Sequence, residues 1–284
     1  MQTLEPVLVV DLFPLERQAL LQLLAQLDEE EWQKPTVCAG WTVKDVVLHI
    51  LGDDIGFLSG KRDAFDSLSI AGNPPDLSVW DNLVAFLNER NALWVEATRR
   101  MSHQLACPFL ALTGAELYQY LQKLDLFAPG DTVSWAGPDA APVWLDIARE
   151  YTERWLHQQH IRDAVNRPGL KDPQFLAPIL NTFIYALPRT FSTVRAPNGT
   201  TILLHISGAS GGDWLLQRQQ SAWQLGKPDT PDIAHVAASV ILDQETAWRL
   251  FTRGISKEEA MQHATLTGNA DLARKLFDTV SIIA

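Results

Sequence analysis

The feature that most constrains the fold is a change of apolar periodicity near "NRPGLKDP", residues 166–173. Before this segment, apolar residues recur at the spacing of amphipathic helices. Four main helical segments and one short piece are expected, with connections that suit antiparallel neighbours. We therefore expect an up-down four-helix bundle over residues 1–168. The main segments span 12–28, 78–101 and about 143–165, with a further one that opens at Thr42 and has apolar positions up to Leu51. The short piece lies at 115–124.

After this segment, short apolar runs alternate with polar residues between Gly, Asn and Ser turns, a pattern typical of antiparallel strands. Residues 169–284 are therefore expected to form a small α+β domain with an antiparallel sheet, and the whole chain is of the α+β class. A helix at 174–191 precedes expected strands at 200–207, 212–219 and 222–227, then a strand leading into a helix at 237–254 and a last helix at 270–283.

Charge and composition exclude several classes of protein. The chain has 34 acidic and 23 basic residues, a net charge of −11, which argues against a nucleic-acid partner. No apolar run approaches the ~20 residues of a membrane span, and the N-terminus does not resemble a signal peptide. Cys38 and Cys107 are expected to be free thiols. We expect a cytoplasmic protein, a monomer or homodimer, that acts on a small molecule.

One stripe of the helix at 143–165 carries four groups able to bind a metal or move a proton. At about 100° per residue, Glu150, Glu153, His157 and His160 fall within an arc of about 80°. Glu153 and His157 are four residues apart and suit Zn²⁺, Ni²⁺, Fe²⁺ or Mn²⁺. The alternative is an ordinary pair on a surface helix. The sequence has no "HExxH" motif to indicate a zincin.

A third ligand must come from another element, and His49 in "WTVKDVVLHILGDD" is the candidate. It borders the apolar face of its helix, so it is either a core histidine or a ligand facing the bundle interior. With three protein ligands a coordination position stays open, as in catalytic metal sites. Asp45 and Asp53 lie one turn to either side and are either partners of His49 or surface charges.

Two segments resemble one known family. "PTVCAGWTVKDVVLHI" and "EYTERWLHQQHIRDAV" are similar to the second and fourth helices of the mycothiol-dependent maleylpyruvate isomerases, which are related to the DinB-like metal-binding bundles. The resemblance covers the N-terminal bundle and implies His49, Glu153 and His157 as the metal ligands. Where this chain has His160, the family more often has aspartate, so the role of His160 stays open.

The C-terminal part resembles the family's sterol-carrier-like α+β domain through "LTGNADLARKLF". The family has a catalytic arginine there in a Leu-x-x-Gly-Arg stretch. In "WRLFTRGIS" the implied residue is Arg253, with arginine and glycine in reverse order. The alternative is that Arg253 is a cation at the C-terminal end of a helix.

The resemblance implies a metal-dependent enzyme that uses a low-molecular-weight thiol, such as mycothiol or bacillithiol. Zinc is the first expectation for the metal. The reaction would be an isomerisation or S-transfer on a small electrophile, with Glu150 or His160 as a proton carrier and Arg253 as a further catalytic residue. One alternative is a protein that binds a metal or an apolar ligand without turnover. The other is a degenerate bundle that retains the ligand residues without their function. Cys38 is expected to pack rather than react.

Overall fold

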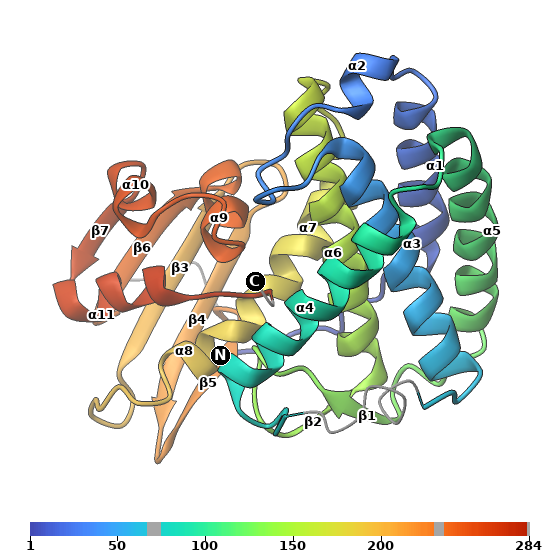
Figure 1. The fold of residues 1–284 in the computed structure, drawn as a ribbon. Helices are drawn as coiled ribbons and strands as arrows, with labels where there is room; N and C mark the ends of the chain where they lie inside the picture. The colour runs from blue at the N-terminus through green and yellow to red at the C-terminus, as the bar shows by residue number, and fades with distance from the viewer. Residues whose placement is uncertain (67–74, 230–235, 283–284) are drawn as a thin grey trace. The chain divides into compact units, whose positions relative to one another are not determined.

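The structure is a computed structural model that describes residues 1–66, 75–229 and 236–282. The chain divides into two compact units (Figure 1). The sheet unit comprises Met1–Val9, Asp125–Thr152 and Lys171–Ala284. The bundle unit comprises Val10–Leu124 and Glu153–Leu170. The division near residue 170 lies beside the expected boundary at 168. Two earlier stretches, Met1–Val9 and Asp125–Thr152, also belong to the sheet unit.

The bundle unit is helical. α3 packs against α4 and α5, and α1 packs against α5. A core of buried aliphatic side chains and Trp32 joins these helices with the later turns of α6. The helices are α1 (Phe13–Leu24), α2 (Glu29–Trp32), α3 (Val43–Phe57) continued by a π-helical segment (Leu58–Arg62), α4 (Trp80–Thr98) and α5 (His103–Leu121). α6 (Val143–Val165) belongs to this unit from Glu153 onward, and its first turns belong to the sheet unit.

Local chemistry explains the start of α3, the helix that carries His49. Thr42 caps the helix by accepting from the backbone N–H of Asp45, and the Asp45 carboxylate accepts from the N–H of Thr42 in return. This reciprocal capping box is the one expected from the sequence. Val43, Val46, Val47 and Ile50 are buried, so one face of α3 belongs to the core.

One helix differs from expectation. The short piece expected at 115–124 is the end of a 19-residue helix, α5, which begins after the capping residue Ser102. Pro108 lies inside this helix. Proline costs one intrahelical hydrogen bond, a local penalty that the burial of Leu110 and Leu117 outweighs here. The sequence at 63–76, which closes with Asn73-Pro74-Pro75, is typical of a loop. This expected loop lies partly outside the described residues, which exclude 67–74.

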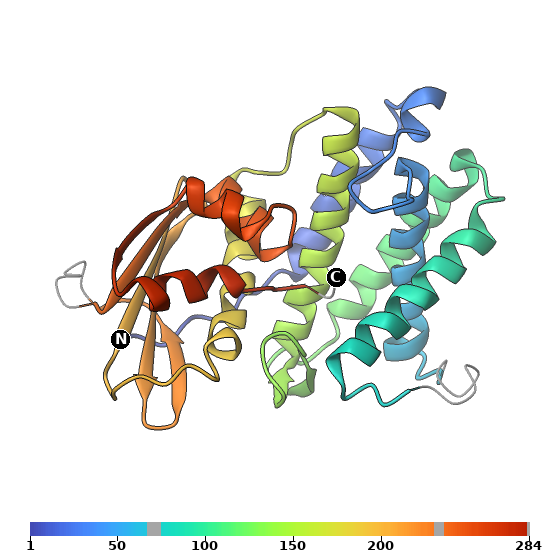
Figure 2. The same ribbon diagram turned by 60° about the vertical axis from the view of Figure 1, so that its left-hand side comes forward.

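The sheet unit contains a five-stranded sheet in the order β5-β4-β3-β6-β7. Neighbouring strands are antiparallel except β3 and β6, which pair in parallel. α9 and α11 pack against β6 (Figure 2). The strands of this sheet are β3 (Thr201–Ser207), β4 (Gly212–Gln219), β5 (Ala222–Gly226), β6 (Ala238–Asp243) and β7 (Thr265–Gly268). The unit also holds a small β1–β2 pair (Pro129–Thr132, Ala140–Pro142), α7 (Pro173–Phe183), α8 (Leu187–Thr190), α9 (Gln244–Phe251), α10 (Lys257–Gln262) and α11 (Ala270–Lys275).

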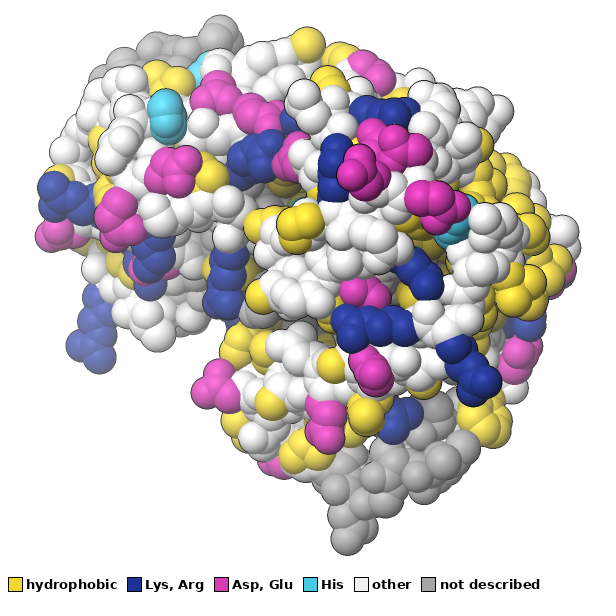
Figure 3. All heavy atoms as spheres, turned by 45° about the horizontal axis from the view of Figure 1, so that its top comes forward, with side chains coloured by type: hydrophobic (Ala, Val, Ile, Leu, Met, Phe, Trp, Pro, Cys, Tyr) yellow, Lys and Arg dark blue, Asp and Glu magenta, His cyan; other side chains and the backbone are white. Residues whose placement is uncertain are grey.

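These elements confirm the expected fold class, a helical N-terminal region followed by a sheet domain. The last helix is shorter than expected. α11 ends at Lys275, and a 3₁₀ turn at Leu276–Asp278 leads to extended backbone at Thr279. None of the described helices is long and apolar enough to cross a membrane. On the face drawn in Figure 3, acidic and basic side chains are interspersed rather than gathered into a basic stripe.

Candidate metal centre

Two histidines that are far apart in sequence meet in the bundle unit. His49 comes from the middle of α3 and is 5% exposed, and His157 comes from α6. Their Nε2 atoms are 3.0 Å apart, and the rings meet edge to face. Two nitrogens that each bind one Zn²⁺ ion at about 2.1 Å can lie at most ~4.2 Å apart. The observed separation therefore fits shared coordination of one ion.

A carboxylate lies beside this pair. Asp53 is one turn after His49 on α3, and its Oδ2 is 3.3 Å from His49 Nε2. His49, Asp53 and His157 each offer a ligand atom within 4.8 Å of the others. Glu153 is half-buried on α6, one turn before His157. It does not belong to either of the two three-residue groups that meet this distance among the described residues.

The second group consists of Cys38, His157 and His160. Cys38 Sγ lies 3.2 Å from His160 Nδ1. Burial raises the pKa of the Cys38 thiol, and a hydrogen bond with Thr36 lowers it by a smaller amount. The protonated thiol can therefore donate a hydrogen bond to the imidazole of His160.

The charge state of the histidines suits metal binding. Burial lowers the pKa of His49 to about 4, and the nearby charges of Arg154 and His160 act in the same direction. Burial, and then the neighbouring His49, hold the pKa of His157 well below its ordinary value. Both imidazoles are thus neutral at pH 7, the form that binds a metal.

One nitrogen of this cluster has no partner. His157 Nδ1 is buried and makes no hydrogen bond in the described part of the chain. A buried nitrogen without a partner costs about 1–3 kcal/mol. Such a group commonly binds an ion or a water. This nitrogen is not the one that faces His49. The fit of the His49 pair to a metal ion rests instead on its donor types, two neutral imidazoles beside a carboxylate.

A buried ionic network fixes the helices that carry the ligands. Asp54 of α3 is fully buried and accepts hydrogen bonds from Arg17 of α1, Thr113 of α5 and Arg154 of α6. Burial raises the pKa of Asp54, but the two guanidinium groups outweigh this and hold it below the usual value. Asp54 is not among the functional residues expected from the sequence. Its signal in the sequence is the pair of aspartates, Asp53 and Asp54, that follows the apolar positions of this helix.

Comparison with known proteins identifies the family of the chain. The family model "Mycothiol maleylpyruvate isomerase N-terminal domain" matches residues 13–162, more than half of the chain. The chain belongs to this family. The matched range contains both members of the histidine pair, the whole first segment on which the expected membership rested, and residues 150–162 of the second. The expected membership is therefore confirmed.

Solved structures support the fold. The crystal structure of a histidine-to-alanine mutant of the mycothiol-dependent maleylpyruvate isomerase has a TM-score of 0.53 and 14% sequence identity, over 91% of each chain. A second crystal structure of the mycothiol-dependent maleylpyruvate isomerase has a TM-score of 0.50 and 15% identity, over 85% of this chain and 86% of that one. No curated protein matches the chain in sequence.

The other candidate catalytic residues occupy different settings. Glu150 is buried on α6, within the sheet unit, and forms an ion pair with Arg149. His160 is half-buried, three residues after His157, with its ring centroid 5.4 Å from that of His157. Arg253 follows α9 in the sheet unit with a φ of 58°, in the left-handed region. Of these three, the structure places His160 among the candidate metal ligands.

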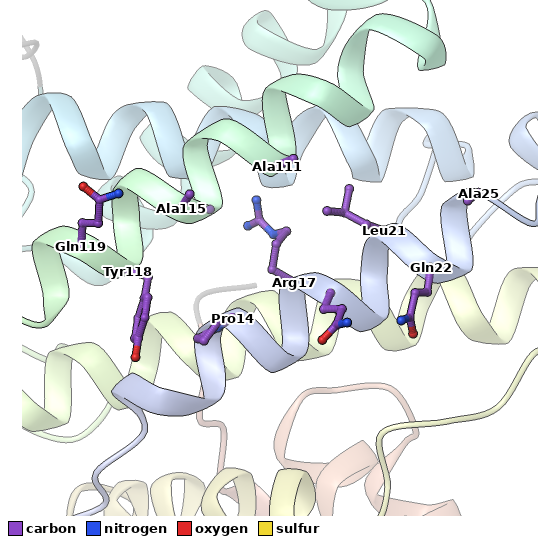
Figure 4. A pocket seen from close by; sticks show the side chains of 11 residues that line it. Pro14, Arg17, Leu21, Gln22, Ala25, Ala111, Ala115, Tyr118 and Gln119 are labelled. Atoms are coloured by element: carbon purple, nitrogen blue, oxygen red, sulfur yellow. The ribbon is translucent and has the colours of Figure 1, made fainter.

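Two hollows lie in the bundle unit. An open groove of about 610 Å³ runs between α1 and α5, with Arg17, Leu21 and Tyr118 among its lining residues (Figure 4). A smaller hollow of about 420 Å³ is lined by Trp41 and by side chains of α4 that include Glu96 and Arg99. The Trp41 ring also lies 5.1 Å from the ring of His49. Trp41 therefore both lines the smaller hollow and contacts His49 of the histidine pair.

Proposed function

We propose that this protein is a metal-dependent enzyme that uses a low-molecular-weight thiol to isomerise or S-transfer a small electrophile, in the manner of a maleylpyruvate isomerase. The observation that carries the proposal is the pair of neutral histidines, His49 and His157, whose Nε2 atoms converge from two helices. Family membership and the names of the solved relatives support mycothiol as the thiol and maleylpyruvate as the model substrate.

His49, Glu153 and His157 would hold the ion, with zinc as the preferred metal for this nitrogen and oxygen donor set. Asp53 lies next to His49 and would orient its ring or take the carboxylate position. When bound, a divalent ion supplies the charge that stabilises a thiolate at neutral pH. The chain's own residues would do the remaining work.

Residues other than the metal ligands would bind and protonate the substrate. The Trp41 ring lies 5.1 Å from the His49 ring and would shield that edge of the site from water. His160, on the same stripe as His157, would move a proton, and Glu150 on the same helix is the second candidate. Arg253 would pair with a carboxylate of the substrate, a task that suits the fork of a guanidinium group.

Metal analysis of purified variants tests the site. His49→Ala and His157→Ala should each lose bound zinc, because two of the three ligands converge at these nitrogens. The exposed His263 is the matched control, and His263→Ala should retain the metal content of the natural protein. Unchanged metal content in both site variants would disprove the proposed ligands.

Paired carboxylate variants identify the third ligand. Glu153→Gln should lose the metal, whereas Asp53→Asn should weaken binding by about 10–100-fold, the usual effect of losing a group that orients a ligand. The reverse order would assign the carboxylate position to Asp53. Assay with mycothiol and maleylpyruvate then tests turnover. A protein that binds zinc but forms no thiol adduct and gives no isomerisation would be a binding protein of the same fold.

A further inference from the structure

The pair formed by Cys38 and His160 lies outside the ligand set of the proposed function. Cys38 precedes α3 and His160 is on α6, 122 residues later, yet Cys38 Sγ lies 3.2 Å from His160 Nδ1. Cys38, His157 and His160 each offer one ligand atom, and these three atoms lie within 4.8 Å of one another. A thiol and two imidazoles form a softer donor set than His49, Asp53 and His157.

The backbone around Cys38 holds its thiol in place. The N–H of Trp41 donates to the carbonyl of Cys38 at 2.9 Å, and Gly40 between them has a φ of 78°. These features are those of a type II turn, in which the third residue needs a positive φ. Thr36 Oγ1 accepts from the N–H of Cys38 and donates to the carbonyl of Trp41. Cys38 is therefore held in a hydrogen-bonded turn.

The two histidines of this set share one face of α6, because residues three apart on a helix are neighbours. His157 uses Nε2 toward His49, while its Nδ1 is buried and unpaired in the described part of the chain. An imidazole has two ring nitrogens that can serve partners on different sides. His157 is therefore the residue common to both groups of candidate ligands.

We propose that Cys38, His157 and His160 form a thiolate-containing metal site that takes a Zn²⁺-like ion and shares His157 with the proposed His49 site. The donor types are those of zinc sites, with Zn–S near 2.3 Å and Zn–N near 2.1 Å. On binding, the Cys38 S–H bond breaks, the sulfur forms a bond to the ion, and the proton passes to solvent. With an ion at the His49 site as well, the neutral His157 ring also loses its one N–H proton to solvent, because both ring nitrogens can bind a metal only in the imidazolate form. The sulfur is not oxidised. The proposal depends on the proposed function only through His157.

Cobalt substitution provides the direct test, because a thiolate bound to Co²⁺ gives an intense near-ultraviolet charge-transfer band that nitrogen and oxygen ligands do not give. The protein loaded with Co²⁺ should show this band. Cys38→Ser should abolish it, and His160→Ala should weaken it. Cys107→Ser is the matched control, since Cys107 is also half-buried and free but lies on α5, and it should keep the band.

The outcomes separate this proposal from the proposed function. Co²⁺ bound without the band, and lost in His49→Ala, would overturn the thiolate site and leave the His49 site standing. A band that persists in His49→Ala, in a protein without thiol-dependent turnover, would support the thiolate site and remove the proposed function.

A second measurement needs no variant. Alkylation of Cys38 by iodoacetamide, followed by mass spectrometry of the natural protein, should slow when Zn²⁺ is added, while alkylation of Cys107 should not change. Equal alkylation of Cys38 with and without Zn²⁺ would overturn the proposal.

Discussion

Arg253 has a backbone conformation that favours glycine. Its N–H donates to the carbonyl of Leu250, and the N–H of Gly254 donates to the carbonyl of Arg249. These two bonds form a Schellman motif at the end of α9, and its left-handed residue is usually glycine. Here Arg253 takes that position with a φ of 58°, and Gly254 follows it. In the order found in this sequence, arginine rather than glycine occupies the left-handed position of the motif.

A residue other than glycine in the left-handed region costs about 1–2 kcal/mol. Arg253→Gly should therefore be more stable than Arg253→Ala by about 1 kcal/mol, as measured by urea unfolding. The comparison uses Ala because both variants lose every interaction of the arginine side chain. Equal stabilities would show that the backbone at this position carries no strain. If Arg253 binds substrate, both variants should lose activity to the same extent.

At the scale of elements, α3 and α4 approach closely through a glycine. A Cβ built on Gly52 would lie 2.5 Å from Nε1 of Trp94, and this indole donates a hydrogen bond to the carbonyl of Leu48 at 2.7 Å. Gly56, one turn later on the same helix, has no atom within 4 Å of such a Cβ. The two glycines therefore differ in packing but share a helix.

Gly52→Ala should destabilise the protein by about 1–3 kcal/mol, the usual cost of overpacking. Gly56→Ala should stabilise it by up to about 1 kcal/mol through helix propensity alone. Thermal or urea unfolding of the two variants checks this difference in sign. If Gly52→Ala proves as stable as Gly56→Ala, the packing of Trp94 against α3 is looser than the structure shows.

The start of α3 should make stability depend on pH. Burial raises the pKa of Asp45, but hydrogen bonds from Arg99 and Thr42 outweigh it and lower the pKa below the ordinary value. A carboxyl group whose pKa is lowered by folding stabilises the protein above its unfolded pKa of about 3.9. This contribution is lost as the pH falls through the folded pKa.

Asp45→Asn should therefore lower the free energy of unfolding by about 1–2 kcal/mol at pH 7, since Arg99 is half-exposed and solvent screens the pair. The difference from the natural protein should shrink as the pH falls below about 4. Urea titrations at both pH values measure it. The control Asp63→Asn removes an exposed partner of Arg62 and should leave the unfolding midpoint unchanged. A difference for Asp45→Asn that stays constant with pH would contradict this account.

At the scale of the whole molecule, the sheet unit is built from three separate stretches of the chain. Near the N-terminus, Gln2 exchanges two backbone hydrogen bonds of 2.9 Å with Lys227, directly after β5. The Trp144 ring, at the start of α6, lies 5.5 Å from the ring of Tyr185. A fragment that begins at residue 169 lacks both of these contributions.

We expect the fragment 169–284 to unfold at a lower temperature than the full chain, with a less cooperative transition by circular dichroism. The fragments 1–168 and 169–284 expressed together should recover stability, because the missing strand partner and the Trp144 side chain are then present. If residues 169–284 alone unfold as cooperatively and at the same temperature as the full chain, the proposed boundary at 168 marks an independent domain.

Much of the fold could be predicted from local patterns. The capping box at Thr42 and Asp45 involves residues three apart, so its chemistry is visible in the sequence. The length of α5 could not be read in this way, because Pro108 interrupts the local pattern and only burial of the helix against its neighbours outweighs that cost. The parallel pairing of β3 with β6 was equally hidden, since alternation of apolar residues does not encode strand direction.

The sequence by itself determined the family, the α+β class and the residue types of the candidate site, because motifs and periodicity are local properties of the chain. Only the tertiary structure decided which of these side chains meet. His49 and His157 are 108 residues apart, and Cys38 and His160 are 122 apart. Their approach depends on helix packing and on the buried network around Asp54. Tertiary packing also brings Cys38 beside His160, whereas Asp53 lies beside His49 through the local spacing of α3.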